Sequence, residues 1–423
     1  MAEPQDVPIP EIFVLWHPRC ALGEKLARRI LEWLRPGNGL GPEVYYRSLP
    51  APDAPPNGLP PPLPGEARPT SNVHAGSRQK VSNMQLVLPL IDENMVADQA
   101  WRHWLGALAS GRASPVQRVI MPIALDTTAY NMPPALRELN YLRPSGLPLP
   151  AGDPMAGAAF EDVVRSLLKQ ITESMCRVML PRPAPPPGTR TSLPGDQLPK
   201  VNVFLSHAKL DGTVPARRLR DYIYGQTQLT AFFDENDIAF GSAFSRVIEA
   251  GVSSSDTAAF IAVRSAAYAS RPWCRREFSL FRKPRPVGRS AGGAERWFSL
   301  PSLVVEAMEG GTSSNGVPEF GNSRMIRWAD GVPNLEELIV TTVVRDAMLA
   351  AFHSAMGASI PSHGKQVIIN SLPDPTTLLH IPKLRSDDYD VLYPGRGLSG
   401  MELDILFDFF PKLTFRSFEE VLS

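Results

Sequence analysis

The stretch V-N-V-F-L-S-H-A-K-L-D, from Val201 to Asp211, decides the fold because an apolar run ends there in a polar loop. That pattern is typical of a buried strand, and a helical pattern follows it. A second box, F-F-D-E-N-D-I-A-F-G-S-A-F, runs from Phe232 to Phe244, and a further strand is predicted at Ala258 to Val263. R-S-A-A-Y-A-S-R-P-W-C-R-R-E-F from Arg264 to Phe278 closes the series. Strands that alternate with helices predict a parallel sheet with helices on both faces, and therefore an α/β fold.

In their order and spacing, these boxes resemble the TIR (Toll/interleukin-1 receptor-like) domain family. The resemblance covers Lys200 to about Phe281 and continues by pattern toward Phe352. It implies a flavodoxin-like parallel sheet with a nucleotide cleft at the carboxyl ends of the strands. The general rule for open α/β sheets places ligands at the same edge. More narrowly, the sequence resembles prokaryotic immune effectors that cleave NAD on infection.

The W-C-R-R-E motif supplies the candidate catalytic residue. It is similar to the TIR motif that carries the catalytic glutamate, and the resemblance therefore implies this role for Glu277. Five residues are candidates for substrate binding. Ser206, His207, Asp211 and Asp237 follow predicted strands, and Trp273 lies in the W-C-R-R-E motif.

One carboxylate suffices for this chemistry. Cleavage between nicotinamide and ribose expels a neutral pyridine from a pyridinium, so the leaving group needs no proton. The sugar becomes oxocarbenium-like, and a nearby anion stabilises the charge as it develops. We expect NAD glycohydrolase activity that releases nicotinamide and ADP-ribose or a cyclic relative, with NAD as substrate and with no cofactor or metal.

Each candidate also has an interpretation without function. Glu277 would then be a solvated residue paired with Arg275 or Arg276, and Trp273 would be a packing residue. His207 would be a loop histidine with no further role. The aspartates, Asp211 and Asp237, would cap helices or close turns.

The loop from Asp234 to Phe244 is a candidate assembly surface. Its apolar residues Ile238 and Phe240 lie between acidic residues and Gly241, and exposed apolar side chains at a loop tip indicate a partner surface. The TIR resemblance implies that this loop packs against a second copy, so we expect self-association through TIR modules. An ordinary loop is the alternative. An infection-sensing protein and a signalling nucleotide stay open as further partners. The rival to an enzyme is a non-enzymatic TIR adaptor that acts through TIR–TIR association.

Composition shifts divide the chain. The proline-rich segment 182–199 is the predicted linker between an α/β module at 1–181 and the TIR domain at 200–356, and a small α/β extension occupies 357–423. The proline-rich segments 50–69 and 283–293 are interpreted as loop insertions. Residues 1–181 resemble a degenerate TIR module, because Trp101 has Leu105 four residues on, where the family has a glutamate.

Bulk properties exclude some classes of protein. Forty-three basic residues balance 43 acidic ones, so nothing favours binding to nucleic acid or to an anionic membrane. The apolar runs, such as 87–91 and 258–263, are too short to span a bilayer. The 3 cysteines are too scattered for a disulfide framework. We therefore expect a cytoplasmic protein.

Overall fold

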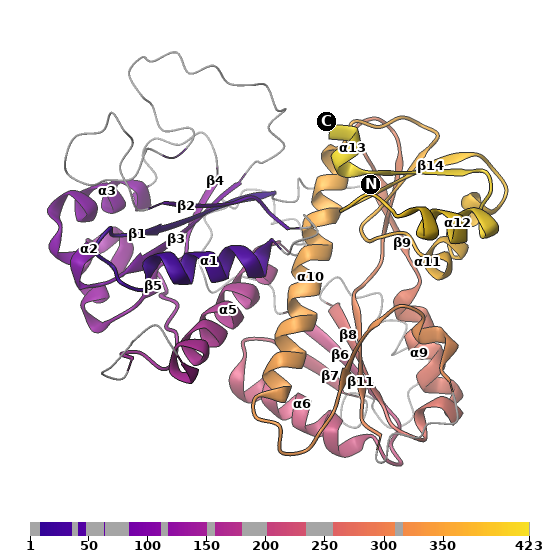
Figure 1. The fold of residues 1–423 in the computed structure, drawn as a ribbon, viewed down its shortest axis with the longest axis horizontal. Helices are drawn as coiled ribbons and strands as arrows, with labels where there is room; N and C mark the ends of the chain where they lie inside the picture. The colour runs from indigo at the N-terminus through magenta and orange to yellow at the C-terminus, as the bar shows by residue number, and fades with distance from the viewer. Residues whose placement is uncertain are drawn as a thin grey trace, which may run out of the picture. The chain divides into compact units, whose positions relative to one another are not determined.

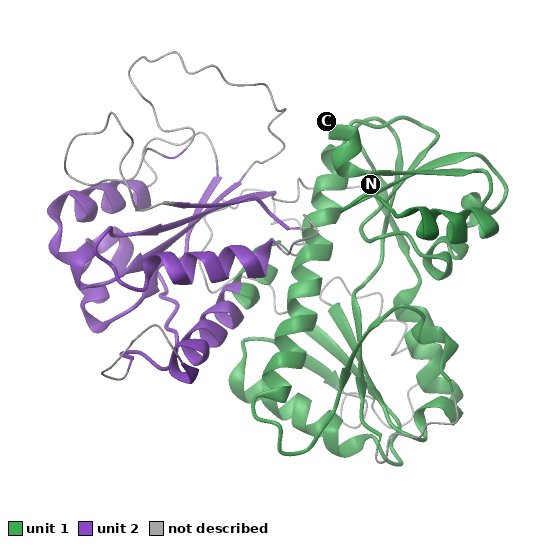
Figure 2. Ribbon diagram, in the orientation of Figure 1, with its two compact units in different colours: residues 1–7, 172–423 green, residues 8–171 purple. Residues whose placement is uncertain are grey.

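The computed structural model describes residues 9–35, 41–47, 63, 84–110, 117–149, 157–179, 201–233, 257–308 and 316–422. The chain divides into two compact units, one of residues 8–171 and the other of residues 172–423 with residues 1–7 (Figure 2). Each unit contains parallel strands connected through helices, so the predicted α/β class is confirmed. The predicted linker at 182–199 lies outside the described residues.

The first unit is built on one parallel sheet. Its strands are β1 (Pro10–Trp16), β2 (Val44–Arg47), β3 (Met84–Ile91), β4 (Gln117–Ile120) and β5 (Ile123–Ala124), in the order β2-β1-β3-β4, with β5 also paired to β3. Every residue of β3 is buried, as expected of a central strand in a parallel sheet covered on both faces. Its helices are α1 (Gly23–Leu34), α2 (Glu93–Ala97), α3 (Gln99–Ala109) and α4 (Pro134–Arg137). The long α5 (Ala158–Met179) begins in this unit and continues past its boundary at residue 171.

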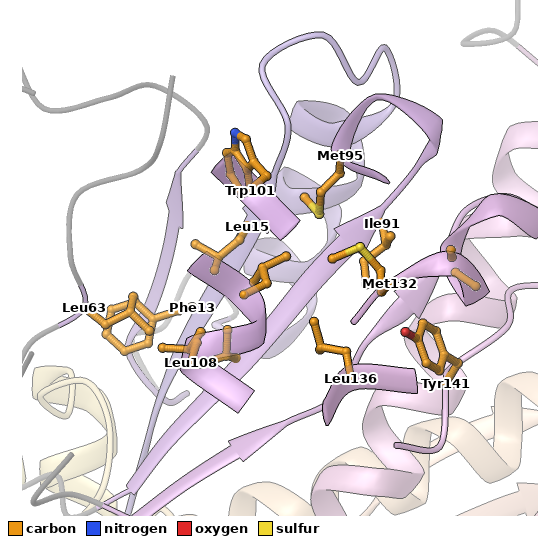
Figure 3. Close-up of a cluster of buried hydrophobic side chains, with 14 residues drawn as sticks. Phe13, Leu15, Leu63, Ile91, Met95, Trp101, Leu108, Met132, Leu136 and Tyr141 are labelled. Atoms are coloured by element: carbon orange, nitrogen blue, oxygen red, sulfur yellow. The ribbon is translucent and has the colours of Figure 1, made fainter. Parts of the chain in front are cut away.

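Side chains from β1 and α3 meet in the core of this unit. Phe13 and Leu15 of β1 belong to one buried cluster with Trp101 and Leu105 of α3 (Figure 3). Trp101 and Leu105 are each fully buried. The helix therefore covers the sheet with an apolar stripe at helical spacing.

The second unit begins with the sheet that was predicted to be flavodoxin-like. Its parallel strands are β6 (Asn202–His207), β7 (Thr230–Phe233), β8 (Thr257–Arg264), β11 (Ser302–Glu306) and β12 (Arg324–Arg327), in the order β12-β11-β8-β6-β7 (Figure 1). Numbered along this domain, that order is the flavodoxin-like 2-1-3-4-5. Its helices are α6 (Thr213–Gln226), α9 (Pro272–Arg282) and α10 (Leu335–Ser359). The predicted sheet type is confirmed.

A further sheet in the same unit combines the C-terminal residues with a hairpin from inside the TIR range. Its strands are β9 (Arg285–Arg289), β10 (Glu295–Phe298), β13 (Gln366–Ile369), β14 (Tyr389–Tyr393) and β15 (Leu413–Ser417), in the order β15-β14-β13-β10-β9. The interpretation of 283–293 as a loop insertion is wrong, because β9 pairs antiparallel with β10. Pro286 misled the prediction: it lies in an edge strand, where a missing N–H costs no ladder bond.

The helix α10 connects these two sheets. It contacts β8 and β11 of one sheet and β10 and β13 of the other (Figure 1). Within the described part of the chain, it alone has the length and mean hydropathy (1.3) of a membrane span, although 67% of that window is buried inside the protein. The prediction from sequence considered only uninterrupted apolar runs, so it did not single out residues 335–359 as long and apolar enough for a membrane span. Burial between two sheets explains its composition.

The remaining helices belong to the C-terminal sheet: α11 (Pro375–Leu379), α12 (Gly400–Phe409) and α13 (Phe418–Leu422). The glycine-rich turn between β14 and α12 is held by interactions among its own residues. Gly395 has a φ of 103°, which favours glycine. Ser399 caps α12 in a capping box with Glu402, and Arg396 pairs with the same glutamate.

Candidate functional site

The site lies where the strand order of the TIR sheet reverses. β6 and β8 are neighbours at the centre of this sheet, and the chain leaves them toward opposite sides. In a flavodoxin-like sheet this switch point is where ligands bind, at the carboxyl ends of the strands. Ser206 and His207 end β6, and residues 265–271 connect β8 to α9. The strand topology thus brings these two segments of the predicted site together.

Glu277 is held by a buried serine. The Ser206 hydroxyl donates to Glu277 Oε2 at 2.6 Å, although the two residues are 71 positions apart. Glu277 is 5% exposed and Ser206 is 1% exposed. The interpretation of Glu277 as a solvated surface residue is therefore wrong. Arg275 pairs with Glu319, and Arg276 lies over the Trp273 ring.

Tyr268 completes this polar group, and the sequence prediction missed it. It lies in the short 3-10 helix η3 (Tyr268–Ser270) and is fully buried. Its hydroxyl is 3.1 Å from Ser206 Oγ and donates to the Cys274 carbonyl at 3.2 Å. Burial raises the pKa of Tyr268 well above its usual value, so the phenol is neutral and can donate. The sequence feature that could have indicated Tyr268 is its position in the stretch from Arg264 to Phe278, between the end of a predicted strand and the W-C-R-R-E motif.

Asp211 joins the two loops at the switch point. Its carboxylate accepts hydrogen bonds from Ser265 Oγ and from the Ala267 backbone N–H. The backbone N–H groups of Asp211 and Gly212 bond to the Ala208 carbonyl, which closes a turn. The structure therefore shows the loop-closing role for Asp211. Binding of a substrate by this residue stays a prediction.

The other predicted binding residues differ in exposure. His207 is 5% exposed, and its carbonyl accepts a hydrogen bond from Cys274 Sγ. Trp273 is 48% exposed, so its interpretation as a packing residue is wrong: it begins α9 at the strand-end edge with its ring toward solvent and Arg276. Asp237 and the assembly residues Ile238, Phe240 and Gly241 lie outside the described residues.

The helix that carries Glu277 is braced by a second 3-10 helix, η5 (Pro318–Phe320). Arg275 donates twice to Glu319 Oε1, at 2.8 and 2.5 Å. Arg282 donates to the Phe320 carbonyl at 2.7 Å and lies 3.4 Å from Asp374, the N-cap of α11. The Phe320 ring packs against Tyr268 and Phe278. η5 therefore fixes α9 from outside and touches the ring of the site tyrosine.

The first unit has no carboxylate at the corresponding position. Counted from the N-caps Asp98 and Arg271, Trp104 of α3 corresponds to Glu277 of α9. The burial pattern supports this register, since buried Trp101 and Leu105 then match buried Cys274 and Phe278. The sequence alignment that placed Leu105 at the glutamate position was wrong by one residue. Either register leaves an apolar side chain there.

The TIR family model matches residues 203–290. Among solved structures, the TIR domains of the activated Roq1 resistosome, which directly recognizes the pathogen effector XopQ, are similar at 16% identity. That match covers 36% of this chain and 84% of the other, with a TM-score of 0.20. A comparison with curated proteins finds no match. Residues 203–290, which run from β6 to β9, thus match the TIR domain family.

Proposed function

We propose that this TIR domain cleaves the bond between nicotinamide and ribose in NAD, with Glu277 as the catalytic carboxylate. The observation that carries the proposal is the buried contact between Glu277 and Ser206, at the sheet edge where flavodoxin-like folds bind ligands. Burying a carboxylate costs several kcal/mol unless partners compensate it. A glutamate held in this way at a ligand-binding edge is a candidate for function rather than for stability.

The proposed reaction needs few groups from the protein. The bond between ribose C1′ and the pyridinium nitrogen breaks, and its electron pair leaves with neutral nicotinamide. Water adds to the sugar and a proton is released, which gives ADP-ribose. In a cyclisation, a nucleophile of the same molecule replaces the water. Glu277 opposes the positive charge on the sugar, and a placed charge of this kind contributes about 3 kcal/mol or more.

Product analysis in water enriched with oxygen-18 tests this proposal. Incubated with NAD, the full chain is expected to release nicotinamide. Hydrolysis would place one solvent oxygen in the ADP-ribose, and a cyclic product would carry none. A properly folded protein that releases no nicotinamide, either dilute or concentrated, would contradict the proposal.

A surface feature favours self-association and keeps the non-enzymatic adaptor as the second candidate function. Leu210 is 72% exposed and Val214 is 67% exposed, next to the carboxyl end of β6, and Trp273 is exposed at the start of α9. Exposed apolar residues that gather at one edge are typical of a partner surface. We propose that copies of the TIR domain associate through this edge together with the predicted loop at Ile238, Phe240 and Gly241.

Turnover and particle size, measured against protein concentration, separate the two candidates. An enzyme activated by assembly shows NAD cleavage per molecule that rises as particles grow. An adaptor assembles without cleaving NAD at any concentration.

The cellular setting is part of the proposal. All three cysteines, Cys20, Cys176 and Cys274, are buried thiols that form no disulfide, which supports a reducing compartment such as the cytoplasm. The alanine-, arginine- and proline-rich composition supports a bacterial source with a high-GC genome. We propose a role in prokaryotic defence, in which infection triggers the depletion of NAD.

A further inference from the structure

We propose that Tyr268 is a positioning residue, which acts through Ser206 to orient the Glu277 carboxylate. The inference rests on the proposed function and adds a residue to its machinery. Tyr268 is 62 positions from Ser206 in the chain, yet their oxygens are 3.1 Å apart in the buried interior. The tyrosine thereby joins the β8–α9 connection to the end of β6 and to the helix that carries the glutamate.

The number of hydroxyl hydrogens determines the direction of the hydrogen bonds among Tyr268, Ser206 and Glu277. The two hydroxyl groups hold one hydrogen each, and three oxygen–oxygen contacts have to be made. The carboxylate can only accept, so Ser206 gives its hydrogen to Glu277. The Tyr268 hydrogen is then shared between Ser206 Oγ and the Cys274 carbonyl. Donation to Glu277 comes from Ser206, and Ser206 in turn receives part of the Tyr268 hydrogen, which also bonds the Cys274 carbonyl.

The position of the Tyr268 hydroxyl is fixed on two sides. Its ring is fully buried and packs against Phe320 at a centroid distance of 5.5 Å. The loop before it is attached to the loop after β6, because Asp211 accepts from Ala267 N–H at 2.8 Å. The backbone on both sides of the switch point thus holds the tyrosine. A fixed donor keeps Ser206, and hence the carboxylate, in one orientation as charge develops on the sugar.

The kinetic signature of such a role is a loss in kcat rather than a rise in KM. Tyr268 is covered by protein on all sides, so its hydroxyl does not contribute to the binding of the ground-state substrate. Its removal weakens the hydrogen bond to the charged carboxylate and loosens its orientation. Loss of a donor to the charged form of an acid raises the pKa of that acid. The acid limb of the pH–rate profile is therefore expected to move to higher pH.

The variant Tyr268→Phe removes the hydroxyl and keeps the ring. We expect kcat to fall about tenfold while KM changes less than about twofold. Tyr141→Phe is the matched control, since Tyr141 is 5% exposed and its hydroxyl has no hydrogen-bond partner among the described residues. It should leave kcat, KM and the pH profile unchanged. Equal kcat values for Tyr268→Phe and the parent would overturn the inference.

A double-mutant cycle shows whether Tyr268 acts through Ser206. Ser206→Ala alone is expected to lower kcat by about 10- to 100-fold, because it removes a hydrogen bond to a charged group. In the Ser206→Ala background, Tyr268→Phe should lower kcat less than about twofold, since the serine that links the tyrosine to the carboxylate is already gone. A further tenfold loss in the double variant would contradict action through the serine. If Tyr268→Phe fails to fold, Ser206→Ala still tests the contact with the carboxylate.

A titration that needs no catalysis separates this inference from the proposed function. Carbon-13 NMR of labelled glutamate, assigned with Glu277→Gln, follows the midpoint at which Glu277 takes up its proton. We expect that midpoint to rise in Tyr268→Phe and to stay unchanged in Tyr141→Phe. A rise without any NAD cleavage by the parent would refute the enzyme and support the positioning role. Unchanged midpoints in Tyr268→Phe and in Ser206→Ala would refute that role.

Discussion

The first unit shares the strand order 2-1-3-4 with the TIR domain, but the two fill the switch point of that sheet in opposite ways. In the TIR domain, Ser206 is the last residue but one of β6 and bonds to Glu277. In the first unit, Leu15 holds that place in β1 and Trp104 holds the place of the glutamate in α3. Leu15 belongs to the apolar core cluster, against which Trp104 packs. One scaffold thus carries a polar group in one unit and apolar packing in the other.

This difference indicates where function and stability separate. A buried carboxylate loses hydration that its partners only partly replace, whereas buried leucine and tryptophan gain free energy from leaving water. The apolar arrangement is therefore the one expected where nothing but stability is required. The polar arrangement needs another reason to be kept, which supports a functional site at this position of the TIR domain.

The largest expected effect comes from copying the apolar arrangement into the TIR domain. The double substitution Ser206→Ala with Glu277→Leu should reduce NAD cleavage about a thousandfold or more. It should leave the free energy of unfolding unchanged or raise it by about 1 kcal/mol, because buried ionic groups can often be replaced without loss. Nicotinamide release and urea denaturation measure the two effects. A variant that is inactive and less stable by about 3 kcal/mol would contradict the claim that the polar arrangement is kept for function rather than for stability.

The next largest effects are losses of stability when a core side chain is truncated in the first unit or in the TIR domain. Leu105→Ala should destabilise the first unit by about 3 kcal/mol, since it leaves a cavity around a fully buried position. Phe278→Ala at the corresponding position of α9 should cost a similar or larger amount, about 3–5 kcal/mol. Differential scanning calorimetry follows unfolding, and an NAD assay below the transition follows activity. Only Phe278→Ala should reduce cleavage, because it alone disturbs α9. Equal losses of activity in both variants would contradict the assignment of the site to one unit.

A smaller effect is expected from the brace between α9 and η5. Arg282→Ala removes a buried donor to the carbonyls of Glu319 and Phe320 and should cost about 2 kcal/mol of stability. Arg276→Ala, whose side chain lies over the exposed Trp273 ring, should cost less than about 0.5 kcal/mol. Thermal denaturation compares them. Indistinguishable melting temperatures for the two variants would mean that the brace contributes nothing.

The smallest effect concerns pH and the C-terminal sheet. Hydrogen bonds from Arg396 and then from Ser399 lower the pKa of Glu402 to about 2 from an ordinary value of 4.5. A carboxyl group with a lowered pKa stabilises the fold above pH 4.5, and this contribution disappears as the pH falls toward 2. The glutamate is 38% exposed, so the contribution is screened and less than about 1 kcal/mol. Glu402→Gln should flatten the acid side of the stability profile by that amount. An unchanged dependence of stability on pH would contradict a contribution from Glu402.

The sequence predicted the parts of the structure that depend on local pattern. Apolar runs located β6 and β8, the strand-end rule placed Ser206 at the ligand-binding edge, and the resemblance to the TIR motif singled out Glu277. Contacts between distant residues were not predictable in this way. The hydroxyl of Tyr268 meets Ser206 only after the sheet has formed, and Arg282 reaches backbone carbonyls that carry no sequence signal.

Other errors came from rules applied without their context. Proline and glycine indicated a loop at 283–293, yet they are tolerated in the edge strand β9. The alternative interpretation of Trp273 as a packing residue failed, because its place at the first turn of α9 leaves its ring 48% exposed. The first unit was aligned by its tryptophan, and the N-cap and burial of α3 give a register shifted by one residue.

The most direct test of the account compares nicotinamide release by the parent chain, by Glu277→Gln and by Glu419→Gln. Glu277→Gln keeps the shape of the buried side chain and removes its charge, while Glu419 lies exposed in α13 and serves as the matched control. All three proteins are assayed at the same high concentration after circular dichroism has confirmed equal folding. We predict parental activity in Glu419→Gln and a loss of about a thousandfold or more in Glu277→Gln. Parental turnover by folded Glu277→Gln would contradict the account.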